Sequence, residues 1–188
     1  MNHVMIDLIN VSKKPSSPLC AIEAVFFEPS TGQIGKVFYS SIDIRKSESL
    51  KGRISISTAF DWMKKDSHWR AEVMSATEAE EDALCSFAAF IADNTCPRNA
   101  ALFVWFEDAP EKLVSLHYAV DRLEVSGILP EGTKYRCIRS LLDLAAATDY
   151  APHARSALAR YTLTDARYQA EQVCEIWQRL TSPHIGSL

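Results

Sequence analysis

The sequence has 188 residues, of which 47% are hydrophobic and 23% are charged, and its formal net charge is −4. This length and composition are typical of one soluble domain with a sizeable core. The negative charge argues against a strongly basic protein that binds nucleic acid without specificity, although it is compatible with a locally basic groove. No stretch approaches the roughly 20 apolar residues of a membrane-spanning helix, so we expect a cytoplasmic protein with no membrane partner.

The cysteines support this location. They are five in number, widely spaced, and contain no CxxC pair. Such a pattern favours buried thiols in a reducing compartment over disulfides or a metal centre. The residues concerned are Cys20, Cys85, Cys96, Cys137 and Cys174.

The N-terminal part of the chain predicts an antiparallel meander of three strands. Residues 3–10, 19–29 and 36–44 are rich in Val, Ile and Phe, which favour strands. The first connection, "SKKPSSP", is stiffened by two prolines, and the second, "EPSTGQIG", has turn chemistry.

Helical spacing follows the meander. Residues 57–73 predict one or two short helices, with Ser57 or Thr58 as a candidate N-cap. Residues 76–94 predict a longer helix, because acids gather at its N-terminal end, where the helix dipole favours them. Its apolar residues recur at i, i+3, i+4 and i+7: Leu84, Phe87, Ala88 and Ile91.

The C-terminal half begins with an apolar run, residues 99–108, which predicts a strand buried on both faces. Pro110 suits the first turn of a helix over 111–125. "GILPEGTKYRCI" predicts turns and a short strand, and helices are expected over 139–149 and 163–180. Three strands, a helix, a strand and further helices indicate an α/β sandwich with a mixed sheet. We expect one domain over residues 1–180 and a loose tail over 181–188.

One acid in the first strand needs an explanation. Asp7 stands inside the apolar run "VMIDLIN". An ionised carboxylate in a buried strand costs several kcal/mol unless a partner or ligand compensates it. Ile9, two residues further, shares the same face because the strand repeat is two residues.

Four segments carry a family resemblance. They are "HVMIDLINVSKKPSSPLCAIEAVFFEPSTGQIG", "ISISTAFDWMKKDSHWRAE", "FVWFEDAPEKLVSLHYAVDRL" and "LTDARYQAEQV". In this order they resemble the DEDD-type (DnaQ-like) 3′–5′ exonucleases, specifically their exodeoxyribonuclease VIII-like phage and prophage branch. The resemblance covers nearly the whole chain and implies an RNase H-like fold, in which helices flank a central mixed sheet of five strands.

The resemblance also implies a chemistry and its residues. These enzymes cleave phosphodiesters with two Mg²⁺ or Mn²⁺ ions held about 3.5–4 Å apart by four carboxylates, and in one branch a His acts as the base. Asp7 and Asp165 match the first and last acids. The Glu of the first motif falls on Ile9, the Asp of the second on Lys112, and the His on Arg160.

Three outcomes are open for this degenerate site. Lys112 or Arg160 could pair with the acids in a metal-free site, for which no cofactor is expected. Asp7 and Asp165 could instead hold one Mg²⁺ or Mn²⁺ weakly. A rebuilt catalytic site could recruit Glu23, with Glu107, Asp108 and Glu111 as further acids that are expected to be ordinary solvated residues. The five histidines have no metal-ligand spacing, although His153 is a candidate displaced base.

The expected function is therefore that of a pseudoenzyme: an exonuclease-like protein that acts by binding. Its target is single-stranded nucleic acid, DNA or RNA, or a protein partner. Trp62 and Trp69 fall in the segment that walls the substrate groove in the resembled family, so they are core residues or base-stacking residues. The alternative is a slow or altered metal-dependent exonuclease that uses Asp7, Asp165 and Glu23. The resemblance leaves a homodimer open.

Overall fold

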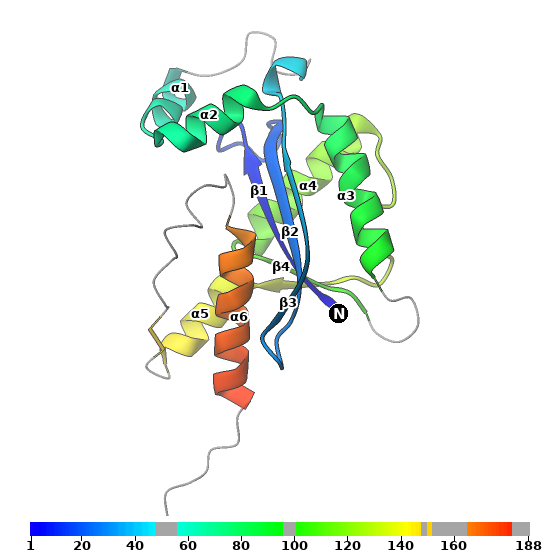
Figure 1. Ribbon diagram of the computed structural model, residues 1–188, viewed down its shortest axis with the longest axis vertical. Coiled ribbons are helices and arrows are strands. Elements are labelled where there is room, and N and C mark those ends of the chain that lie inside the picture. Colours follow the sequence, from blue (N-terminus) through cyan, green and yellow to red (C-terminus); the bar gives the residue numbers. More distant parts are fainter. Residues whose placement is uncertain (48–55, 96–100, 148–149, 152–164, 182–188) are drawn as a thin grey trace, which may run out of the picture.

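A computed structural model describes residues 1–47, 56–95, 101–147, 150–151 and 165–181 of the chain (Figure 1). Its centre is a mixed five-stranded sheet with helices on both faces, and the strand order is β3-β2-β1-β4-β5. The α/β fold class and the five-stranded mixed sheet expected from the sequence are therefore confirmed. No helix in the described part of the chain is long and apolar enough to cross a membrane.

The predicted meander is present. β1 (His3–Asn10) pairs antiparallel with β2 (Leu19–Glu28), which pairs antiparallel with β3 (Gln33–Ser41). β3 begins three residues earlier than the sequence predicts because the preceding turn is tight. The turn ends at Gly32, whose φ of 77° favours glycine and whose amide donates to the Glu28 carbonyl over 2.9 Å.

The other two strands extend the sheet in parallel. β4 (Phe103–Phe106) pairs with β1, and β5 (Lys134–Cys137) pairs with β4. β4 is shorter than the apolar run over 99–108, but its last three residues are buried, as predicted. Because β1 and β4 are parallel, the segments that follow them lie at the same edge of the sheet.

Helices cover both faces of the sheet. α3 and α4 pack on the face that carries Val4, Ile6 and Leu8, and α6 packs on the face that carries Met5 and Phe27. α1 and α2 lie beyond the end of β1 (Figure 1). The helices are η1 (Ile44–Lys46), α1 (Ile56–Met63), α2 (Ser67–Ser75), α3 (Glu80–Asn94), α4 (Ala109–Leu123), α5 (Ile138–Ala146) and α6 (Ala166–Thr181).

The segment over 57–73 forms two short helices, one of the two arrangements predicted. Ser57 and Thr58 lie inside α1, so the prediction that one of them caps it is wrong, because the backbone is already helical at Ile56. Within this segment, a side-chain cap is present at α2. There the Asp66 carboxylate accepts a hydrogen bond from the Trp69 amide over 2.8 Å. Residues 182–188, most of the expected loose tail, lie outside the described residues.

Candidate functional site

Two buried carboxylates face each other across the centre of the sheet. Asp7 in β1 and Glu23 in β2 are directly opposed in the antiparallel pairing, so their side chains point to the same face. Asp7 is 5% exposed and Glu23 is 6% exposed. Like charges at this spacing and burial repel each other, so each carboxylate needs its own compensating donor.

The N-terminus of α6 supplies one donor to each acid. The Asp165 amide donates to Asp7 Oδ2 over 3.0 Å, and the Ala166 amide donates to Glu23 Oε2 over 2.8 Å. Amides in the first turn of a helix have no partner inside the helix, and the helix dipole favours anions there. The two acids thus anchor α6 to the sheet, and the contact that Asp165 makes with Asp7 here comes from its backbone amide.

Lys112 supplies a positive charge to the same place. It lies in the first turn of α4, and its Nζ atom is 3.5 Å from Asp7 Oδ1. The ammonium also donates to the Leu8 carbonyl over 2.5 Å. Its side chain is 20% exposed, against 6% for the Asp7 side chain. This ion pair is therefore only partly screened by solvent and holds the start of α4 against the end of β1.

Ile9 continues this face of β1 beyond Asp7. It packs with Ala21 and Val73 and against the indole rings of Trp62 and Trp69. It therefore contributes an apolar contact that attaches α1 and α2 to the sheet. The sequence predicts the position of this side chain but not its apolar partners.

These residues fit a pair of divalent cations poorly. Mg²⁺ and Mn²⁺ favour several oxygen ligands in near-octahedral arrangement, whereas Ile9 supplies none and Lys112 brings an ammonium to Asp7. In the ranges that the structure covers, no group of three or more His, Cys, Asp or Glu side chains could hold a metal ion.

The other site residues predicted from the sequence lie further from Asp7 and Glu23 or fall outside the described residues. Glu107 is half exposed and accepts a hydrogen bond from Gln169 Nε2 over 3.3 Å, and the carboxylate of Asp108 is 3.4 Å from Arg139. Glu111 lines the groove described next. Arg160, on which the family's His falls, and His153, the candidate displaced base, lie outside the described residues.

A groove of about 260 Å³ opens beside Lys112. Trp62 and Trp69 form one wall, with ring centroids 5.2 Å apart in an edge-to-face arrangement. The Lys65 ammonium lies 5.7 Å from the centre of the Trp69 ring. Lys13 and Lys65 belong to two short basic stretches that are far apart in the sequence, and only the fold brings them to one groove. The lining includes Ile9, Lys13, Trp62, Lys65, Trp69 and Lys112.

Comparisons with known proteins agree with this architecture. The Rv2179c-like family, described as a 3′-5′ exoribonuclease Rv2179c-like domain, matches residues 2–177, so the chain belongs to this family. No curated protein sequence matches the chain. A solved structure described as "3′-end specific recognition of histone mRNA stem-loop by 3′-exonuclease" is similar in fold. Its TM-score is 0.61 at 10% identity, and the alignment covers 95% of this chain and 80% of that one.

The predicted relation to 3′–5′ exonucleases is therefore confirmed at the level of the fold and the superfamily. The phage and prophage branch within that superfamily stays a prediction.

Proposed function

We propose that this chain is an exoribonuclease-like domain that has lost nuclease activity and binds single-stranded RNA in the groove beside Asp7. The observation that carries the first half is the position of the Lys112 ammonium, 3.5 Å from Asp7 Oδ1 and 2.5 Å from the Leu8 carbonyl oxygen. A cation of the protein stands against the carboxylate that would have to hold a metal.

The physical argument is electrostatic. Two-metal cleavage needs a strongly anionic site that gathers four positive charges and leaves them open to the phosphate. Here one acid is balanced by Lys112, and both Asp7 and Glu23 accept hydrogen bonds from the α6 N-terminus. Glu23 Oε2 already accepts from the Ala166 amide, which leaves fewer of its lone pairs for a metal.

The second half rests on the groove. Indole rings stack on any nucleobase, and lysines attract the phosphate backbone, so their combination is typical of sites for single-stranded nucleic acid. Trp62, Trp69, Lys13 and Lys65 supply both components. The family's description as an exoribonuclease domain favours RNA over DNA as the ligand. A protein partner is the competing target.

The nuclease half is tested by incubating 5′-labelled single-stranded RNA and DNA with the full chain and Mg²⁺ or Mn²⁺. We expect no metal-dependent shortening. Degradation that is lost in Asp7→Asn, the substitution that best conserves shape at this buried position, would refute the proposal. The double variant Ile9→Glu/Lys112→Asp is the matched comparison, because it returns two carboxylates to the site. It should bind Mn²⁺ by calorimetry more tightly than the unmodified chain.

The binding half is tested by fluorescence anisotropy with a labelled oligouridine RNA. We expect saturable binding that weakens as salt is raised, because lysine–phosphate contacts release counterions. Lys65→Ala should weaken RNA binding. Lys36→Ala should not, because Lys36 is an exposed lysine of β3 that does not line the groove. Failure to bind RNA or DNA at low salt, with capture of a protein partner through the groove instead, would refute RNA as the ligand.

A further inference from the structure

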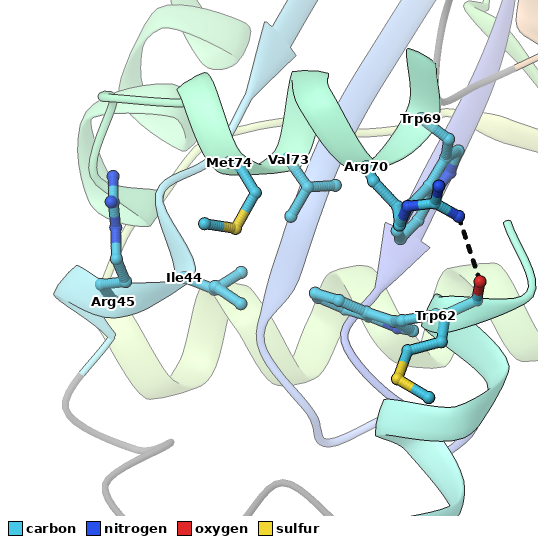
Figure 2. A pocket seen from close by; sticks show the side chains of 8 residues that line it. Ile44, Arg45, Trp62, Trp69, Arg70, Val73 and Met74 are labelled. Atoms are coloured by element: carbon cyan, nitrogen blue, oxygen red, sulfur yellow. Dashed lines mark hydrogen bonds between the residues drawn. The ribbon is translucent and has the colours of Figure 1, made fainter. Parts of the chain in front are cut away.

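A second pocket lies on the other side of the tryptophan pair (Figure 2). It has a volume of about 170 Å³ and is enclosed by η1, α1 and α2. Its walls are almost wholly apolar, and its two guanidinium groups belong to Arg45 and Arg70 at opposite ends (Figure 2). The apolar lining consists of Ile44, Trp62, Met63, Trp69, Val73 and Met74.

Much of this apolar surface faces solvent. The side chains of Met63 and Met74 are among the most exposed large hydrophobic residues of the described chain, at 62% and 68%. Exposed apolar surface of this kind, concave and rimmed by charge, is typical of a binding site. Pockets for drug-sized ligands measure roughly 300–1,000 Å³, so this one is matched to a smaller group, such as a single ring system.

We propose that this pocket binds one unstacked nucleobase of the RNA strand that lies in the adjacent groove; this inference rests on the proposed function. Trp62 and Trp69 line both cavities, so the pocket and the groove adjoin each other at this aromatic pair. A strand that stacks on this pair on the groove side can place its next base on the far side.

The positively charged side chains at the rim of the pocket favour the binding of a polyanion. Arg70 donates to the Met63 carbonyl over 3.0 Å and to the Lys65 carbonyl, which fixes its guanidinium beside the pocket. Both acceptors are neutral, so these two bonds leave its positive charge uncompensated. Arg45 is paired with Asp43 over 2.7 Å, and thus contributes less. Lys65 adds a second cation at the Trp69 ring.

Thioether side chains suit this role chemically. They are polarizable, make favourable contacts with aromatic rings and adapt to rings of different shape. A pocket built from Met63, Met74 and two indoles therefore accepts purines and pyrimidines alike. The absence of a directional polar group from the apolar walls, among the described lining residues, predicts weak sequence preference.

The methionines also provide the test. The chain has four methionines, two of which line the pocket, while Met5 is fully buried in the core. In ¹³C-methyl-methionine NMR of the full chain, titration with oligouridine RNA should move the Met63 and Met74 methyl signals upfield through ring currents and leave Met5 unchanged. The same RNA with abasic positions should bind without these shifts.

Affinity gives an independent readout. The double variant Met63→Gln/Met74→Gln should bind the RNA about tenfold more weakly, within the range of one base stack. Leu144→Gln, an equally exposed apolar residue of α5, is the matched control and should bind normally.

The outcomes separate the two proposals. RNA binding at the groove with unchanged Met63 and Met74 signals overturns the base pocket and leaves the proposed function standing. No RNA binding at all overturns the proposed function as well. Shifts of both methyl groups with an acidic peptide that carries one Phe, but not with RNA, would assign the pocket to a protein partner and overturn the inference.

Discussion

Replacing Lys112 by Met removes the ammonium while keeping most of the side-chain length, and it tests the electrostatics of the site. In the structure this ammonium has two partners: the carboxylate of Asp7 at 3.5 Å and the carbonyl of Leu8 at 2.5 Å. Met cannot replace either contact. Lys112→Met therefore removes this cation from the buried charge of Asp7.

The size of the effect follows from these distances. At an effective dielectric constant of 20, two unit charges 3.5 Å apart attract each other by about 5 kcal/mol. Breaking a buried pair by removing one partner costs about 3–5 kcal/mol. Asp7 keeps its bond to the Asp165 amide, and Lys112 is 20% exposed, so both values are upper limits here. We expect a loss of about 2–3 kcal/mol in the free energy of unfolding.

Urea unfolding followed by circular dichroism measures this loss. Lys36→Met, a substitution at an exposed lysine of β3, is the matched control and should stay within about 0.5 kcal/mol of the unmodified chain. A double-mutant cycle with Asp7→Asn isolates the pair, and its coupling energy should exceed about 1 kcal/mol. Additive effects of the two substitutions would show that the ion pair contributes nothing, and the electrostatic argument against a metal site would lose its foundation.

Three further predictions concern other parts of the molecule. Trp69→Ala should weaken RNA binding measured by anisotropy by about fivefold or more, because one stacking wall is lost; unchanged affinity would make Trp69 purely structural. Asp66→Ala should lower the thermal midpoint by removing the α2 cap, at a cost of about 1 kcal/mol. Burial lowers the pKa of His3 below 6.5, and its Nδ1 accepts from Trp105 Nε1. Its contribution to stability is thus present above pH 6.5 and is lost as the pH falls toward the folded-state value. His3→Gln should flatten this acid limb in urea unfolding, and an unaltered limb would contradict the assignment.

Local pattern predicts the elements well where periodicity is strong. The meander, the helix predicted over 76–94 and the buried strand before α4 follow from alternation and helical spacing, which depend on near neighbours only, although that helix begins at Glu80. Errors occur where the local signal is ambiguous. Ser57 and Thr58 are good N-cap types, yet the helix begins before them, and Asp66 in the following turn caps α2 instead.

For the candidate site too, some features can be predicted from the sequence and others depend on the tertiary structure. Chemical type alone marks Asp7 as an anomaly, and only the family resemblance predicts that Ile9 and Lys112 stand at ligand positions. The sequence therefore determines which charges the site contains. The tertiary structure decides which groups meet, because pairing depends on contacts between residues more than a hundred positions apart. Lys112 reaches Asp7 because β1 and β4 run in parallel and bring α4 to the end of β1.

The sequence by itself determined the mixed sheet, its helical layers and the identity of the charged residues, since these follow from spacing and side-chain chemistry. Only the tertiary structure decided that Asp7 and Glu23 anchor the α6 N-terminus and that two tryptophans line both a groove with several lysines and an apolar pocket. The physical reason is that a backbone amide at a helix end carries no sequence signal, and a cavity exists only between elements that have already packed.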